Sequence, residues 1–423
     1  MTVRLVHSHT PAEDAVVLFD GDTPVLLRLE SVGDLPVGAV CLARVLKRVS
    51  NILFVEIDGK TAFLQDDGAY CGISCERAEK RPDQGDLLLV QVVRAASEDK
   101  DVKVSGRLAM PFSYFVDTPA DTGVSVSRKI PDAERARLKK LFENEKGAFT
   151  VRTAAQGVSD DVLKSELAAM KAARSALADK AANGKTGVLK KPAPLAEALL
   201  EEYAPVLTEA VSDDPQTAAR LKNSFPVLRY SPRCLWEEGG IADAFDQATA
   251  RRVPLPSGGS LIIEETAACV CFDVNAGGSG FVETNREAAA EIPKQVVLKD
   301  LSGQMIVDFA GRKDRKFLAS LAEGLKNSNA GLNVWGVTAL GLVEMTRKGG
   351  KASILEQSAK TAWRETAGLV RRLWFSKPHG DLCVYVPDGV GALFSPFLPL
   401  LKERLGVSIS VKRGENIFTE GTD

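Results

Sequence analysis

The sequence is poor in histidine, the side chain that most enzymes use for acid–base catalysis. Only His7, His9 and His379 occur among 423 residues, and their spacing matches no catalytic pattern. We therefore expect exposed or hydrogen-bonded structural histidines. If the protein is an enzyme, other groups must carry its chemistry.

Long apolar runs and a large net charge are also absent. No run of 18 apolar residues occurs, so we expect no membrane span. The net charge is −2, so a nucleic-acid partner would have to bind local basic patches. The first four residues lack the charged and apolar regions of a signal peptide, and we expect a cytoplasmic protein.

The seven cysteines are odd in number and scattered, which indicates reduced thiols. Cys71 and Cys75 have CxxxC spacing, but neither a second pair nor a histidine lies nearby. Small buried side chains are therefore favoured over a zinc site at this position.

The length predicts two to four domains of mixed α/β and α+β structure. Five short strands in residues 36–107 predict a small closed barrel. Phe54 and Phe63 lie in two of these strands beside polar residues; they either fill the barrel core or face outward and stack on bases. Residues 351–423 alternate helix and strand patterns, which indicates a small α/β module.

The central stretch, residues 261–309, contains two strand-like runs that end in acids, with a helix-like segment between them. Asp273 and Asn275 end the first run on one face, and Asp308 ends the second. In a βαβ unit the two strands would be parallel neighbours, so these groups would converge at the carboxyl ends. Such an all-oxygen site suits Mg2+.

Two basic features are less specific. Arg152 and Thr153 end another predicted strand. They either bind a phosphate, or they are an ordinary salt bridge or a solvated strand end. The segment from Arg312 to Lys316 follows Asp308 and is either a contact to a phosphate backbone or a solvated helix face.

Several motifs together resemble the catalytic half of the bacterial ribonuclease E/G family, in the family's order and over nearly the whole chain. They are Val151-Arg152-Thr153-Ala154, Ser257-Gly258-Gly259, Asp273-Val274-Asn275, Thr284-Asn285, Asp300-Leu301, Ile306-Val307-Asp308-Phe309 and Gly341 to Arg347.

The resemblance implies a domain order. Residues 1–35 and 195–252 would form an RNase H-like structural domain, into which an OB-fold RNA-binding barrel (36–107) and a 5′ sensor region (108–194) are inserted. A DNase I-like catalytic α/β domain (253–350) and the small C-terminal domain (351–423) would follow.

The resemblance also implies roles for individual residues. Asp273 and Asp308 would hold Mg2+, and Asn275 would orient the scissile phosphate. Phe54, Phe63 and Lys100 would contact RNA, while Val116, Arg152 and Thr153 would sense a 5′-monophosphate.

The chain departs from the family pattern in several places, of which two bear on zinc binding and on 5′-phosphate sensing. No cysteine follows the Gly341–Arg347 motif until Cys383, so the family's zinc-link motif is absent. We therefore expect no zinc, and a monomer or dimer rather than a zinc-linked tetramer. Phe112 replaces a small residue at the start of the sensor motif, where its ring would narrow the 5′-phosphate pocket.

These observations predict a Mg2+-dependent endoribonuclease that cleaves single-stranded RNA to 5′-phosphate and 3′-hydroxyl ends in RNA processing or decay. Two alternatives stay open. One is an RNA-binding protein of the same fold with little or no catalysis, and the other is an assembly factor acting on ribosomal RNA precursors.

Overall fold

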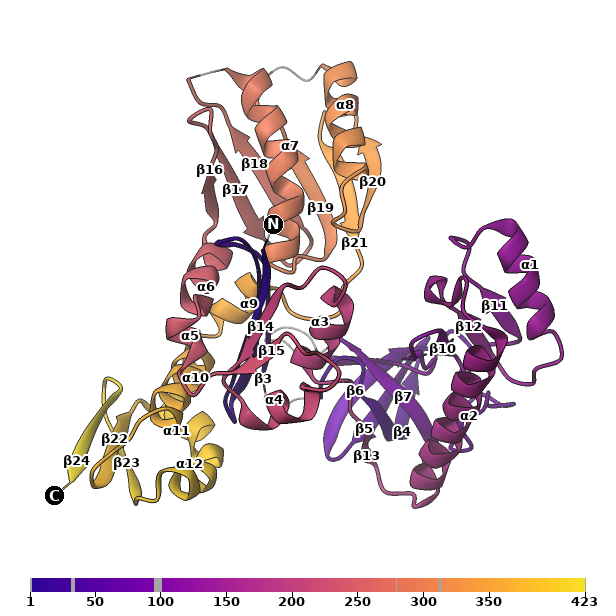
Figure 1. Cartoon of the computed structure of the whole chain (residues 1–423), viewed down its shortest axis with the longest axis horizontal. Helices are drawn as coiled ribbons and strands as arrows, with labels where there is room; N and C mark the ends of the chain where they lie inside the picture. The colour runs from indigo at the N-terminus through magenta and orange to yellow at the C-terminus, as the bar shows by residue number, and fades with distance from the viewer. Residues whose placement is uncertain (1, 32–34, 95–100, 279, 312–313, 423) are drawn as a thin grey trace. The chain divides into compact units, whose positions relative to one another are not determined.

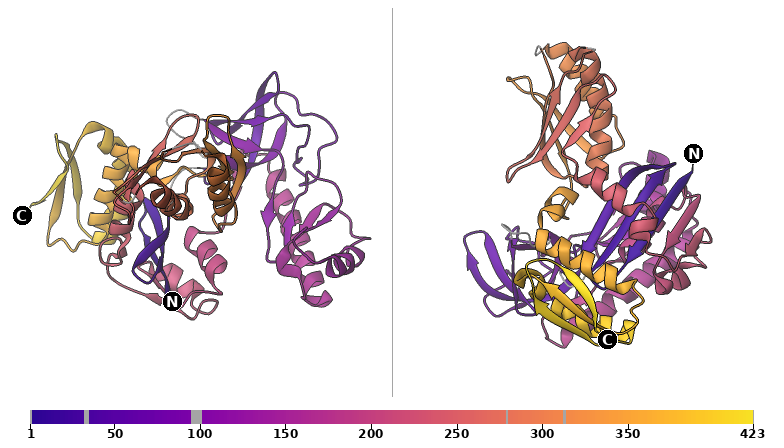
Figure 2. Two further views of the ribbon diagram at one scale, coloured as in Figure 1. Left: turned by 90° about the horizontal axis from the view of Figure 1, so that it is seen from above. Right: turned by 90° about the vertical axis from the view of Figure 1, so that its left-hand side faces the viewer.

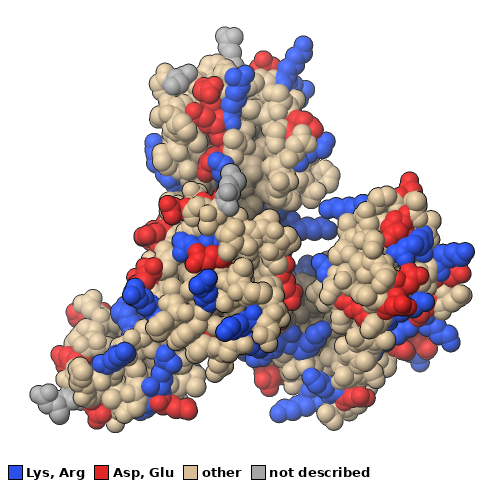
Figure 3. Space-filling model, viewed as in Figure 1, with Lys and Arg blue, Asp and Glu red and all other residues tan. Residues whose placement is uncertain are grey.

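The computed structural model describes residues 2–31, 35–94, 101–278, 280–311 and 314–422 (Figure 1). The chain divides into two compact units, residues 34–192 and residues 1–33 with 193–423. Within the described ranges, no helix is long and apolar enough to cross a membrane. On the face in Figure 3, basic and acidic side chains are interspersed on both units, in keeping with the small net charge.

The unit of residues 34–192 begins with a closed five-stranded barrel, as the sequence predicts. Its strand order is β4-β5-β6-β8-β7, and pairing of β4 with β7 closes it. Alternate residues of β5, such as Leu53 and Val55, are fully buried inside. The strands are β4 (Val40–Val49), β5 (Ile52–Ile57), β6 (Lys60–Gln65), β7 (Leu87–Arg94) and β8 (Val102–Ser105), and β13 (Gly187–Lys190) pairs with β4 outside the ring.

A four-stranded sheet of order β11-β12-β10-β9 follows the barrel. The edge-to-face rings of Phe115, Phe142 and Phe149 form its core. Arg174 pairs with the fully buried Asp117 and ties the long helix α2 to the sheet. The elements are β9 (Met110–Pro111), β10 (Phe115–Asp117), β11 (Val124–Val126), α1 (Asp132–Leu141), β12 (Phe149–Val151), η1 (Thr153–Ala155) and α2 (Asp160–Ala182).

The other unit contains a five-stranded sheet that joins distant parts of the chain. Its order is β15-β14-β1-β2-β3, with β1 parallel to β14 and antiparallel to β2. Helix α3 packs on one face, and α5 and α6 pack on the other. The elements are β1 (Val3–His9), β2 (Glu13–Asp20), β3 (Thr23–Ser31), α3 (Leu195–Tyr203), β14 (Glu209–Ser212), α4 (Pro215–Leu221), β15 (Leu228–Tyr230), α5 (Leu235–Glu238) and α6 (Ile241–Thr249).

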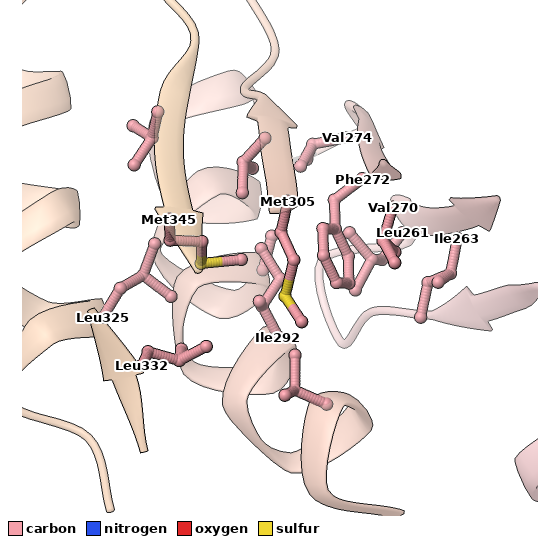
Figure 4. Close-up of a cluster of buried hydrophobic side chains, with 14 of the residues drawn as sticks. Leu261, Ile263, Val270, Phe272, Val274, Ile292, Met305, Leu325, Leu332 and Met345 are labelled. Carbon is pink, nitrogen blue, oxygen red and sulfur yellow. The ribbon is translucent and has the colours of Figure 1, made fainter. Parts of the chain in front are cut away.

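A six-stranded sheet of order β16-β17-β18-β19-β21-β20 comes next. As expected, β18 and β19 are parallel neighbours joined by a helix, α7. Helices α7 and α8 lie side by side on one face of this sheet (Figures 1 and 2), over the apolar cluster in Figure 4. The elements are β16 (Arg252–Pro254), β17 (Ser260–Glu265), β18 (Val270–Asn275), α7 (Phe281–Leu298), β19 (Gly303–Asp308), α8 (Arg315–Lys326), β20 (Leu332–Val337) and β21 (Val343–Arg347).

The residues after α7 connect the two sheets of this unit. Asp300 Oδ1 lies 3.2 Å from Arg28 of β3 and accepts a 3.0 Å hydrogen bond from Arg347 of β21. The Nζ atom of the buried Lys299 donates to the carbonyls of Gln247, Ala248 and Ala250 at the end of α6. These polar contacts fix the second sheet to the first.

The C-terminal module pairs β22 parallel to β23 and antiparallel to β24. Residues 354–374 form two helices that meet at Lys360, and Ser353 caps the first by accepting a hydrogen bond from the Glu356 N–H. The strand β24 was not expected. The elements are α9 (Ile354–Ala359), α10 (Thr361–Trp374), β22 (Asp381–Val386), α11 (Asp388–Phe394), η2 (Ser395–Phe397), α12 (Leu398–Leu405), β23 (Ile409–Arg413) and β24 (Phe418–Thr422).

We predict that Asp300→Asn destabilises this unit by about 2–4 kcal/mol, because two largely buried guanidinium groups lose their shared carboxylate. Asparagine is chosen because Asp300 has a φ of 52°, which asparagine tolerates. Urea unfolding monitored by circular dichroism measures the change. Glu238→Gln, which breaks an exposed pair with Arg233, is the control and should leave the midpoint nearly unchanged. Equal midpoints for both variants would contradict the role of Asp300.

Candidate functional site

Asp273 and Asp308 lie directly beside each other on the face of the sheet opposite α7 and α8. The two residues are Cα partners at the ends of the parallel strands β18 and β19, and both are exposed. Their neighbours Phe272 and Val307 point to the other face and are buried in the core. The alternation of side chains along a strand therefore presents both carboxylates to solvent.

Asn275 belongs to the same group. Its amide nitrogen donates a 3.0 Å hydrogen bond to Asp273 Oδ2. Asn275 thus holds one oxygen of the Asp273 carboxylate by a hydrogen bond from its amide nitrogen. The two carboxylates and the asparagine, predicted to converge, are brought together here.

The chain around these residues is held by close backbone contacts. A Cβ atom on Gly277 would collide with the backbone of the 257–259 turn, and one on Gly259 would lie 2.6 Å from the Asn275 carbonyl oxygen. Thr284 at the start of α7 bonds to Ser257 Oγ at 2.9 Å. The two turns therefore pack together only because glycine stands at both contact points.

The segment after Asp308 is fixed by one side chain. The Asn285 amide accepts from the Ala310 N–H and donates to the Ala310 carbonyl, each at 2.9 Å. Because Asn285 is buried in α7, this pair of bonds ties the end of β19 to the helix.

Cys271 shares the exposed face with Asp273. Partial burial and then the adjacent Cys269 thiol, 3.7 Å away, raise the pKa of Cys271. The thiol is therefore protonated at neutral pH in the absence of a metal ion.

Trp335 was not singled out from the sequence. It is the extra residue of a β-bulge in β20, its side chain is 74% exposed, and its indole N–H donates to Thr346 Oγ1 at 3.2 Å. Thr346 alternates with the buried Met345, so the ring lies on the same face as the acids. In the sequence, the signal for this position is a tryptophan beside Gly336 in a strand-like run, where an internal glycine indicates a bulge.

In the barrel, Phe54 and Phe63 are direct cross-strand partners on the outer surface, since Leu53 and Leu64 beside them fill the interior. The alternative that these rings form the barrel core is wrong. Lys47 Nζ lies 5.1 Å from the centre of the Phe54 ring, and Arg94 Cζ 5.7 Å from that of Phe63. The aromatic pair is thus bordered by cations that the sequence did not identify as its neighbours.

The three residues expected at the 5′ sensor come from two segments, β10 and the turn after β12. Arg152 N donates to the Tyr114 carbonyl, and its guanidinium donates to the Phe112 carbonyl. Thr153 Oγ1 lies 3.0 Å from Ser127 Oγ. Val116 is part of β10 and pairs with Thr150 one strand away. Arg152 and Thr153 are exposed, and Lys190 lies over the Phe112 ring.

Lys100 and the basic residues Arg312 and Lys313 lie outside the described residues. Lys316, the last residue of that basic segment, is in the first turn of α8, after Asp314 caps the helix.

A family model for the ribonuclease E/G family matches residues 109–349. Ribonuclease G of Escherichia coli K12 is 30% identical over 401 residues, covering 84% of this chain and 81% of that protein. Ribonuclease E of Synechocystis is 30% identical over 295 residues, covering 62% of this chain and 43% of that protein. The chain belongs to the ribonuclease E/G family.

The motifs that carried the family resemblance have different physical roles. Asp273, Asn275 and Asp308 face solvent together. Asn285, by contrast, is buried and hydrogen-bonds the backbone of Ala310. Asp300 and Arg347 form an ion pair at the junction of two sheets. A motif match in this family therefore does not by itself separate site residues from structural ones.

We predict that Gly277→Ala costs about 1–3 kcal/mol, because the added Cβ pushes the Ser257–Gly259 turn away from the loop after Asn275. Hydrogen exchange of residues 254–260 and 275–278 should accelerate with the loss of packing. Gly278→Ala is the matched control, since a Cβ there meets nothing within 4 Å. If both variants exchange like the wild type, the close approach of the turns is not required.

Proposed function

We propose that this member of the ribonuclease E/G family is a Mg2+-dependent endoribonuclease that cleaves single-stranded RNA and leaves 5′-phosphate and 3′-hydroxyl ends. The main support is the register pairing of Asp273 with Asp308 on an exposed sheet face. The family match and the relatives named ribonuclease G and ribonuclease E support RNA as the substrate and RNA processing or decay as the setting.

The donor set fits Mg2+. Carboxylate oxygens of Asp273 and Asp308 are hard ligands on adjacent strands, and the exposed position leaves room for the waters that Mg2+ retains. Bound there, Mg2+ would neutralise charge on the phosphodiester and lower the pKa of a coordinated water. Asn275 keeps the Asp273 carboxylate oriented and offers its amide to the scissile phosphate.

Aromatic and basic side chains would present the RNA. We infer that the barrel is an OB-fold, because its closed strand order equals 1-2-3-5-4-1. Phe54 and Phe63, bordered by Lys47 and Arg94, would stack unpaired bases at about 1–3 kcal/mol per base. Lys100 would add a basic contact. Trp335 offers a further stacking surface on the same face as the acids. Such contacts favour single strands because paired bases cannot reach the rings.

We also propose that Val116, Arg152 and Thr153 sense a 5′-monophosphate. The guanidinium of Arg152 is exposed, and the hydroxyls of Thr153 and Ser127 are adjacent to each other. These are donors suited to a terminal phosphate. The Arg152 guanidinium donates a hydrogen bond to the Phe112 carbonyl, and this bond orients it. Phe112 is the residue whose ring was expected to narrow the pocket.

The remaining assignments are proposals of the same kind. The first sheet, with three antiparallel strands followed by two parallel ones in the order 3-2-1-4-5, supports an RNase H-like domain. No cysteine occurs between Arg347 and Cys383. We therefore propose a monomer or dimer that is not linked by zinc in this segment. A cytoplasmic location is a separate proposal.

We predict that Asp308→Asn and Asp273→Asn each reduce cleavage by about 10²–10⁴-fold, since each removes one anionic ligand. A 5′-labelled single-stranded RNA, incubated with and without Mg2+ and resolved on a gel, gives the rate and the product ends. RNA binding should persist in both variants.

Glu323→Gln, on the opposite side of the sheet in α8, is the control and should cleave like the wild type. An unchanged product pattern in Asp308→Asn would disprove the nuclease site. If the wild type binds RNA but shows no Mg2+-dependent cleavage, the result would favour the alternative of an RNA-binding protein without catalysis.

We predict separately that an RNA with a 5′-monophosphate is cut faster than the same RNA with a 5′-hydroxyl, and that Arg152→Ala removes the difference. The loss of a charge-assisted hydrogen bond corresponds to about 10-fold or more in the rate for the phosphorylated RNA. Lys139→Ala, an exposed charge on α1, is the control. Equal wild-type rates on both RNAs would reject the sensor while leaving the nuclease proposal intact.

A further inference from the structure

His7, His9 and Asp14 form a cluster on the first sheet that the proposed nuclease activity does not use. His7 and His9 are two residues apart on β1, and Asp14 is the cross-strand partner of His9 on β2. Side chains two apart share one face of a strand, so the three groups lie together. One ligand atom from each lies within 4.8 Å of the others.

Both imidazole rings are directed at one oxygen atom. His7 Nε2 lies 3.1 Å and His9 Nδ1 2.6 Å from Asp14 Oδ1. In a tetrahedral site with metal–ligand bonds of about 2.0–2.1 Å, ligand atoms are separated by roughly 3.3 Å. The two nitrogen–oxygen distances are slightly shorter than this separation, so Asp14 would have to move only a little from the two nitrogens for a metal ion to enter.

The remaining nitrogen of His7 has a partner of its own. His7 Nδ1 lies 2.8 Å from Ser212 Oγ, and Ser212 is positioned by the pairing of β1 with β14. Such a bond fixes the ring orientation and leaves Nε2 directed at the cluster, as is usual for a metal-ligating histidine. The two acids that follow Ser212 in the chain accept other hydrogen bonds. Asp213 accepts from the Ser8 hydroxyl and the His9 N–H, and Asp214 caps α4.

The burial of the three groups is graded. The His7 side chain is 3% exposed, whereas those of Asp14 and His9 are 20% and 34% exposed. A bound ion would thus be held by the buried His7 on one side and remain open to water on the side of His9. Two imidazoles and one carboxylate favour Zn2+ and neighbouring transition metals, while Mg2+ prefers oxygen donors.

We propose that His7, His9 and Asp14 form a binding site for a Zn2+-class divalent transition metal, separate from the acids of β18 and β19 and independent of the nuclease proposal. His7 Nε2, His9 Nδ1 and an Asp14 oxygen are the ligands, and water fills the open position. Ser212 is a positioning residue that acts through His7.

The test is a titration of chelator-treated, full-length protein with Co2+, followed by its visible absorption, and with Zn2+, followed by calorimetry. Both are carried out in excess Mg2+ and in the Asp308→Asn background, so that binding at the other acids does not contribute. We expect one equivalent to bind with a ligand-field spectrum of low-coordinate Co2+. His9→Gln and Asp14→Asn should abolish this signal, and Ser212→Ala should weaken binding by about 10–100-fold.

The third histidine supplies the control. His379 is outside the cluster, and His379→Gln should bind like the parent protein. His9 and Asp14 are partly exposed, so both variants should retain the far-ultraviolet circular dichroism of the parent. Absence of stoichiometric binding, or binding equal in His9→Gln, Asp14→Asn and the parent, would overturn the proposal and leave a hydrogen-bonded histidine pair.

Discussion

The parallel pairing of β18 with β19 is the constraint on which the candidate nuclease site depends. It places Asp273 and Asp308 side by side, an arrangement that brings two negative charges together. The pairing is maintained from the other face, where Phe272, Val307 and the apolar side of α7 are excluded from water. Asn275 offsets part of the charge by donating to Asp273.

The rest of that unit supports this pair of strands at several levels. Asn285 holds the backbone after Asp308, and glycines allow the turns around Asn275 to approach each other. Farther away, Asp300 anchors the sheet to β3 through Arg28. The buried polar groups in these contacts all have partners, so the residues that support the acids leave no hydrogen bond unmade at these points.

The two candidate cation sites differ in donor chemistry. The acids of β18 and β19 offer oxygen atoms on an open face, whereas the cluster on β1 and β2 offers two imidazoles beside one carboxylate. Because transition metals prefer nitrogen donors and Mg2+ prefers oxygen, the sites should select different ions from a mixture. His7 and His9 form the hydrogen bonds expected of structural histidines, and metal binding by the same side chains is an additional proposal.

The closed barrel, the βαβ order of the central stretch and the convergence of Asp273, Asn275 and Asp308 could be predicted from the residues alone. These follow from local patterns, namely strand alternation, strand length and the parallel arrangement of a βαβ unit. Tertiary structure decided which side Phe54 and Phe63 face, where the bulge directs Trp335, and that Asp300 and Arg347 bind each other. It also brought Ser212 to His7, more than 200 residues away in the chain. A contact such as that of Ser212 with His7 depends on which distant strands pair, and local residue patterns do not specify this pairing.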